Sequence, residues 1–230
     1  MPWFFYDPTI LILIPALLIG MVAQMLVNSA YRKYARVETR AGVNASQAAR
    51  EMLDRAGCTD VALDYVAGEL SDHYDPRSRV LRLSGGVGGS DSIAALGIAA
   101  HEVGHAIQHH QGYGLLKLRT SLVPVVNIGS SLAFPLVLLG LFFSPEIAMV
   151  GVALYGLAVI FQLVTLPVEL NASARARALL SEGGYVTGPE LDGVGKVLNA
   201  AAFTYLAAAI ASILQLLRLF ILAGGGRRRD

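Results

Sequence analysis

The pentapeptide His101-Glu102-Val103-Gly104-His105 carries the clearest chemistry in this sequence of 230 residues. It matches the H-E-x-x-H pattern, in which two histidines four residues apart lie on one face of a helix. Both imidazoles can then bind one zinc ion, and the adjacent glutamate can reach a zinc-bound water. We therefore predict that His101 and His105 bind zinc (Zn2+), one ion per chain, and that Glu102 is the general base. Because the pattern is short, a chance match on a structural helix is the alternative.

A catalytic zinc site needs a third protein ligand and one open coordination position. Gln108 and Gln111 stand where a metzincin would place a glycine and a third histidine, which excludes that subclass. Glu169 is the first candidate for the third ligand, and His73 is the second. The alternative for Glu169 is an ordinary charge at the membrane interface, because it directly follows an apolar block.

The pattern lies on a segment with signals for the start and the end of a helix. Asp91 or Ser92 is expected to cap a helix that runs to about Gln111, and Gly112 is expected to end it. The residues that flank the motif are small or apolar, so this helix should be buried. Two histidines and a glutamate inside a buried helix are costly without a partner, which favours a metal site.

The rest of the polar segment predicts a small α+β region. Asn44 is expected to cap an amphipathic helix that ends near Ala56. Short strands are expected at 61–66 and at 79–83. The glycines at 85–89 are expected to form a flexible linker before the helix of the motif.

Apolar residues make up 54% of the chain and charged residues only 15%, against about a quarter in a soluble domain. Charge-free blocks cover 8–31, 120–145, 147–168 and 197–217. Each is long enough for a membrane helix, which needs about 20 residues. The composition therefore predicts a membrane protein with three or four transmembrane helices.

The first and the last block leave alternatives open. The first is expected to be a retained anchor with an aromatic belt at 3–6, because a signal peptide would begin with basic residues. The fourth candidate span, roughly Ala200–Leu222, extends past its block and holds Gln215 and Arg218. It could span the membrane, lie along its surface or pack in a core.

The positions of the basic residues predict the orientation. Four of them follow the first block and none precedes it, which by the positive-inside rule places 32–120 in the cytoplasm. The protein is thus expected in the cell (inner or plasma) membrane as a multi-pass protein whose active site faces the cytoplasm. The arginines at 227–229 conflict with this orientation if the chain crosses four times.

The predicted fold class is a mainly α integral membrane protein with a small cytoplasmic α+β, zincin-like region. The expected order is an N-terminal transmembrane helix (1–31), a cytoplasmic metallopeptidase segment (32–120), a transmembrane hairpin (121–168), a cytoplasmic segment with the third zinc ligand (169–199), a fourth transmembrane or interfacial helix (200–223) and a basic tail (224–230).

Four motifs together resemble the YugP-type neutral zinc metallopeptidases, a family of bacterial membrane proteins. They are Met1-Pro2-Trp3-Phe4-Phe5-Tyr6-Asp7-Pro8, Asp72-His73-Tyr74-Asp75-Pro76, the stretch 100–108 around the H-E-x-x-H motif, and the stretch 166–176 around Glu169. The resemblance implies peptidase activity, with His101, His105 and Glu169 as zinc ligands and Glu102 as general base.

A more distant likeness is to the HtpX-like membrane proteases, which pair H-E-x-x-H with a downstream Glu-x-x-Ala-Asp. Glu169 and Ala172 fit that pattern, but Ser173 replaces the aspartate. That aspartate supports a zinc-binding histidine, so this support is expected to come from elsewhere.

Two further roles are hypotheses. Residues Arg79, Val80, Leu81, Arg82 and Leu83 are expected to form an edge strand that pairs with the substrate backbone, as in related zinc peptidases. An ordinary sheet strand is the alternative. Arg175 or His73 is expected to stabilise the oxyanion or support the site, and the alternative for Arg175 is a positive-inside anchor.

The sequence thus predicts a zinc endopeptidase of the membrane that hydrolyses peptide bonds with a zinc-activated water. Its expected partners are a peptide or protein substrate and the lipid bilayer, with membrane proteins as further candidates. The net charge of +1 argues against nucleic acid. The alternative is a non-catalytic, zinc-stabilised membrane adaptor, but a scaffold would not need Glu102. A transporter is disfavoured because the first three apolar blocks hold no charged residue.

Overall fold

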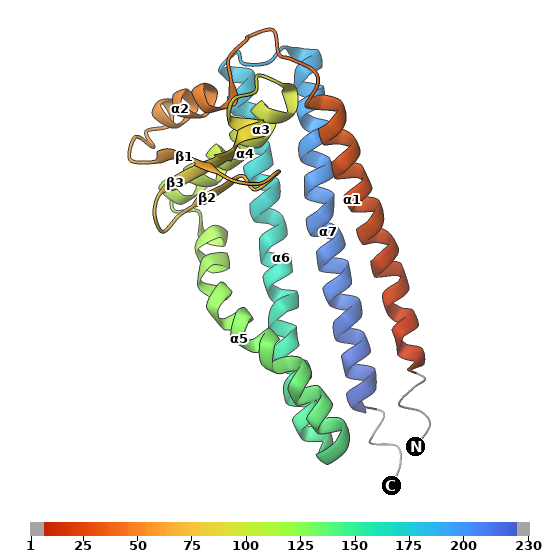
Figure 1. Cartoon of the computed structure of the whole chain (residues 1–230). Coiled ribbons are helices and arrows are strands. Elements are labelled where there is room, and N and C mark those ends of the chain that lie inside the picture. The colour runs from red at the N-terminus through yellow and green to blue at the C-terminus, as the bar shows by residue number, and fades with distance from the viewer. Residues whose placement is uncertain (1–6, 225–230) are drawn as a thin grey trace. The chain divides into compact units, whose positions relative to one another are not determined.

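The computed structural model describes residues 7–224, and four of its helices are long and apolar enough to cross a membrane (Figure 1). The predicted aromatic belt at 3–6 and the arginines at 227–229 lie outside the described residues. The four candidate spans are Pro8–Tyr34, Gly114–Phe143, Pro145–Glu182 and Gly188–Gly224. Together with a small sheet, they confirm the prediction of a mainly α membrane protein with a small α+β part.

The first span has two parts. It begins as the 3-10 helix η2 (Pro8–Leu13), whose first turn is capped by Asp7, and continues as α1 (Ile14–Tyr34). The second span is α5 (Gly114–Phe143), which holds Pro124 and Pro135 inside the helix.

The last two spans are longer than the apolar blocks that predict them. Helix α6 runs over Pro145–Glu182 and α7 over Gly188–Gly224. The expected segment 169–199 is therefore mostly helical, and only 183–187 separate the two helices. The expected fourth transmembrane or interfacial helix at 200–223 is thus the later part of α7, which begins at Gly188.

The chain divides into two compact units. Within the described residues, the first takes 7–23, 118–166 and 204–224, and the second takes 24–117 and 167–203. The first unit consists of apolar helix and has a small core of Val137, Ala148, Val152, Leu219 and Ala223. The second unit contains the sheet, the H-E-x-x-H helix and Glu169.

The second unit is built on helices α2 (Ala45–Arg55) and α4 (Ile93–His110), which pack against each other and share one core. Asn44 caps α2 by accepting a hydrogen bond from the backbone N–H of Gln47, as predicted. Ser92 caps α4 in the same way through Ala95. Most of α4 is buried, which confirms the prediction from its apolar flanks.

The sheet has three strands, β1 (Ala62–Val66), β2 (His73–Asp75) and β3 (Val80–Ser84), in the order β1-β3-β2. Strand β1 runs parallel to β3, and β2 runs antiparallel to it. The expected strands at 61–66 and 79–83 correspond to β1 and β3. Strand β2 was not predicted, because three residues are too few to show an alternating pattern.

The prediction that Arg79, Val80, Leu81, Arg82 and Leu83 form an edge strand is wrong, because β3 lies in the middle of the sheet. Its backbone pairs with β1 on one side and with β2 on the other. Beyond the end of β2, the backbone N–H of Ser84 donates to the carboxylate of Asp72 at 2.7 Å. Within the described residues, β3 therefore has no open side for a substrate backbone, and β2 is the edge strand nearer to α4.

The prediction of a flexible linker at 85–89 is also wrong. Gly85–Gly88 form a short helix, α3, directly after β3. The side chain of Val87 is fully buried, and a Cβ atom on Gly88 would lie 2.8 Å from the hydroxyl of Ser46. Packing against α2 and α4 thus orders a segment whose composition alone indicates flexibility.

Candidate metal centre

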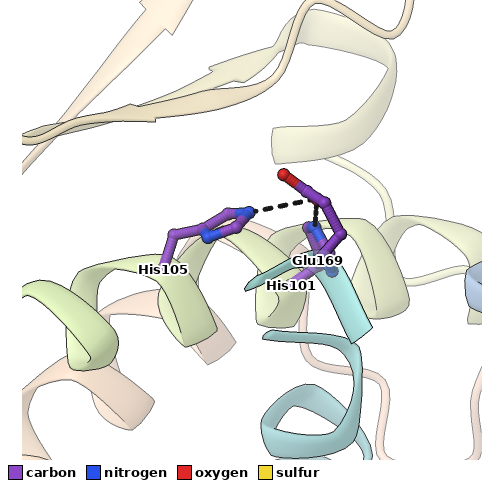
Figure 2. A group of neighbouring side chains, drawn as sticks. All are labelled: His101, His105 and Glu169. Atoms are coloured by element: carbon purple, nitrogen blue, oxygen red, sulfur yellow. Dashed lines mark hydrogen bonds and ion pairs between the residues drawn. The ribbon is translucent and has the colours of Figure 1, made fainter. Parts of the chain in front are cut away.

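Helix α4 presents His101 and His105 one turn apart, and α6 presents Glu169 to both of them. Figure 2 shows the two imidazole rings directed at the carboxylate. The rings are nearly perpendicular, with their centroids 4.7 Å apart. Glu169 Oε2 lies 3.2 Å from Nε2 of His101 and 3.4 Å from Nε2 of His105. One nitrogen of each ring and one carboxylate oxygen thus converge on a common point.

This geometry fits a zinc ion. The ligand atoms of the three residues all lie within 4.8 Å of one another. Two ligand atoms that are each about 2.0–2.1 Å from a zinc ion, at tetrahedral angles, are about 3.4 Å apart. Two imidazoles and one carboxylate are also the protein ligands of one class of catalytic zinc site, in which the fourth position stays open.

The candidate site is mostly buried. Glu169 is 2% exposed, and the side chains of His101 and His105 are 14% and 11% exposed. Burial lowers the pKa of His105, but the hydrogen bond to Glu169 and the charge of Glu102 raise this pKa by more. The acidic side chains around His105 therefore favour positive charge at this position, which is where a metal cation would bind.

The other nitrogen of each ring has its own partner. Nδ1 of His101 lies 3.1 Å from the hydroxyl of Ser173, and Nδ1 of His105 lies 3.0 Å from Oε1 of Gln108. In the tautomer that leaves Nε2 free for a metal, both Nδ1–H groups donate to these oxygens. The expectation that support for the histidine comes from elsewhere than Ser173 is wrong, because the serine hydroxyl itself reaches His101.

The contact between Gln108 and His105 was not predicted from the sequence, in which Gln108 marks a departure from the metzincin pattern. The spacing of three residues between His105 and Gln108 could have indicated this contact, because residues three apart are neighbours on a helix surface. A glutamine three residues after a proposed ligand, among apolar residues, is in position to contact it.

Glu102 contacts the edge strand of the sheet. Its Oε2 accepts a hydrogen bond from the backbone N–H of Tyr74 at 2.9 Å. The phenol oxygen of Tyr74 lies 2.8 Å from Nδ1 of His109. Burial raises the pKa of Tyr74 to about 12, so the phenol keeps its proton and can donate it to this nitrogen. Two contacts therefore attach β2 to the helix of the motif.

The hydrogen bonds of the remaining predicted site residues, His73 and Arg175, go to groups other than the three convergent side chains. His73 is exposed on β2, with Nδ1 2.8 Å from the carbonyl oxygen of Ser71. Arg175 donates to Asn171 and to Gln111, both at 2.8 Å. Among the described residues, the metal-ligand group of His101, His105 and Glu169 does not include His73, which favours Glu169 as the third ligand.

Comparison with known proteins agrees with the motifs. A family model described as "Putative neutral zinc metallopeptidase" matches residues 9–224. A curated relative from Bacillus subtilis (strain 168), described as "Putative membrane protease YugP", is 46% identical over 220 residues, which cover 95% of this chain and 97% of that protein. No solved structure matches significantly.

Proposed function

The chain belongs to the neutral zinc metallopeptidase family, as its motifs predicted, and we propose that it is a zinc endopeptidase of the membrane. The observation that carries this proposal is the convergence of His101, His105 and Glu169 next to Glu102. The comparisons do not favour the alternative of a non-catalytic adaptor.

In this proposal His101, His105 and Glu169 hold the zinc ion, and Glu102 transfers protons. The bound metal would polarise the scissile carbonyl and lower the pKa of its water. Glu102 accepts the proton of the attacking water on its carboxylate and passes it to the leaving amine nitrogen. The N–H of Tyr74 holds Oε2 of Glu102, which orients this carboxylate and leaves Oε1 for the proton.

We further propose that the active site faces the cytoplasm. Arg32, Lys33, Arg36 and Arg40 follow the first span, and the other basic residues before α5 extend the same pattern. The substrate is then a peptide or protein chain that reaches the cytoplasmic face of the membrane.

Replacing Glu102 tests the proposed function most directly. We expect Glu102→Gln to keep stoichiometric zinc and to lose at least about 100-fold in kcat/KM, because general acid–base catalysis contributes that much. The measurements are metal content by mass spectrometry and cleavage of internally quenched peptides by the full chain in detergent. Glu182→Gln, the same change at an exposed position of α6, is the matched control. Full activity of Glu102→Gln would refute the role of this residue.

Replacing Glu169 tests the ligand set separately from catalysis. We expect Glu169→Ala to lose most of its bound zinc during purification, because two histidines alone hold the ion too weakly. The zinc content of the purified variant is compared with that of the wild type and of His73→Ala. If Glu169→Ala kept full zinc content while His73→Ala lost it, His73 would be the third ligand instead.

A further inference from the structure

Gln108 is a fully buried amide whose hydrogen bonds join the two helices of the candidate zinc site. Its oxygen Oε1 lies 3.0 Å from Nδ1 of His105 on α4. Its nitrogen Nε2 donates to the backbone carbonyl of Val168 and to the side chain of Asn171 on α6, both at 2.9 Å. Both hydrogens and the oxygen of this amide are therefore engaged.

The contacts on α6 lie next to Glu169. Val168 directly precedes it, so Gln108 holds the backbone of α6 at the residue next to the proposed ligand. Asn171 accepts a second hydrogen bond from Arg175, and Arg175 also donates to Gln111 at the end of α4. Gln108, Asn171, Arg175 and Gln111 thus form a continuous chain of polar contacts between the two helices.

We propose that Gln108 is a positioning residue of the zinc site. Its oxygen fixes the tautomer and the rotation of the His105 ring, so that Nε2 faces Glu169. Its nitrogen at the same time holds α6 in the position relative to α4 at which the carboxylate of Glu169 reaches the His105 ring. This inference rests on the proposed zinc binding by His101, His105 and Glu169.

The contacts of Gln108 require an amide and not a carboxylate. Carboxylates are common partners of zinc-binding histidines, and a glutamate at this position would still accept from Nδ1–H of His105. It would, however, place its second oxygen against the carbonyl of Val168 and the oxygen of Asn171, with no hydrogen to donate. The side chain must accept on one side and donate on the other, which glutamine does.

Two variants separate these functions. Gln108→Met keeps the volume of the buried side chain but offers no hydrogen bond to His105 or to α6. Gln108→Glu keeps the acceptor for His105, loses the donors to α6 and adds one negative charge. We expect both variants to raise the zinc Kd by about 10- to 100-fold, as is typical when the partner of a ligand is replaced.

The experiment measures the zinc Kd of the full chain in detergent by competition with a chelator. The visible spectrum of the cobalt-substituted protein reports the ligand geometry, and thermal unfolding of the metal-free protein reports stability separately. Gln47→Met, the same chemical change at an exposed position of α2, is the control and should bind zinc like the wild type.

The expected result is a weaker Kd and an altered cobalt spectrum in both variants. A wild-type Kd and spectrum in Gln108→Met would overturn the inference, even if its unfolding temperature fell. A wild-type cobalt spectrum together with a wild-type or tighter Kd in Gln108→Glu would show that the bonds to α6 do not set the ligand geometry, and would overturn it as well. Failure of the wild type itself to bind zinc would refute the proposed function, an outcome that the wild-type titration alone identifies.

Discussion

Both histidines of the candidate site are supported by neutral side chains. His101 contacts the hydroxyl of Ser173, and His105 contacts the amide of Gln108. A neutral acceptor leaves the net charge of the buried site unchanged, whereas a carboxylate would add a negative charge beside Glu169. The protein thus orients two imidazoles inside a buried site that already contains one carboxylate.

Ser173→Ala tests the support of His101. The alanine leaves Nδ1–H of this ring without its acceptor in a buried position, so the ring should lose its fixed orientation. We expect the zinc Kd to rise by about 10-fold or more. Ser181→Ala, at an exposed position of the same helix, is the control. An unchanged Kd in Ser173→Ala would mean that the hydroxyl does not orient His101.

At the residue scale, the sequence predicted the three convergent residues but neither of their supports. The H-E-x-x-H spacing fixes His101 and His105 on one helix face, and both the position of Glu169 after an apolar block and the family resemblance indicated Glu169 as the third ligand. The contact between Ser173 and His101 joins two helices distant in sequence, and it depends on the rotation of α6. Nothing in the local pattern encodes that rotation.

At the scale of elements, Gly104 determines how closely α4 approaches α6. A Cβ atom at this position would lie 2.7 Å from the carbonyl oxygen of Ala172 and 3.2 Å from its Cα atom. The backbones of the two helices are therefore nearly in contact, within the same turns that carry His105 and Glu169. The glycine of the motif thus allows ligands from two helices to meet.

We expect Gly104→Ala to destabilise the protein by about 1–3 kcal/mol, because the added methyl group overpacks the contact. Separation of the helices should also weaken zinc binding. The control is Gly114→Ala, where a Cβ would meet no atom within 4 Å among the described residues. Thermal unfolding and the zinc Kd of the two variants are compared. If Gly104→Ala had the same unfolding temperature and zinc Kd as Gly114→Ala, the site would tolerate a wider spacing between α4 and α6.

Tyr185, in the turn between α6 and α7, connects that turn to α2. Its side chain is buried, and its hydroxyl donates to the carboxylate of Glu51 at 2.7 Å. Burial, and then the hydrogen bond and charge of Glu51, raise the pKa of Tyr185 to about 12. This pKa exceeds the value of about 10 in the unfolded chain. The protonated phenol of Tyr185 therefore stabilises the folded state fully below pH 10, and this stabilisation is lost as the pH rises to about 12.

Replacing this tyrosine isolates its contribution to stability. We expect Tyr185→Phe to lose about 1 kcal/mol at neutral pH. The difference in unfolding free energy between wild type and variant should shrink as the pH rises from about 10 to 12, where the wild type loses the proton. Taking the difference cancels other groups that titrate in this range. A difference that stays constant up to pH 12 would contradict the assignment.

The elements themselves were predictable to different degrees. Helices α2 and α4 carry their own caps in Asn44 and Ser92, so local sequence indicates where they begin. Strand β2 and helix α3 carry no such signal, since one depends on pairing with β3 and the other on the burial of Val87. The edge of the sheet was therefore assigned to the wrong strand.

At the scale of the whole molecule, the first unit indicates how often the chain crosses the membrane. Arg218 of α7 forms an ion pair with Asp7, at the start of the first span. Pro145 and Glu146, at the start of α6, line the same cavity as Ala223 and Gly224. The start of the first span, the turn between α5 and α6, and the end of α7 thus gather at one end of this unit.

From this gathering we expect four crossings, because it puts the start of the first span and the end of α7 on the same side of the membrane. The sequence left this number open, since α7 contains the charged residue Arg218. The partner carboxylate of Asp7 reduces the cost of placing this arginine near the membrane. Four crossings would leave the conflict between the positive-inside rule and the arginines at 227–229 of the sequence in place.

Cysteine labelling tests both the number of crossings and the orientation of the site. Cys58 is the sole cysteine and is buried, so the wild type gives the background. On intact cells, a membrane-impermeant maleimide should label Ser144→Cys and Gly224→Cys, whereas Arg77→Cys should react only after permeabilisation. If Gly224→Cys also required permeabilisation, α7 would not cross the membrane. Labelling of Arg77→Cys on intact cells would place the zinc site outside, because Arg77 lies in the turn that follows β2, the strand bound to Glu102.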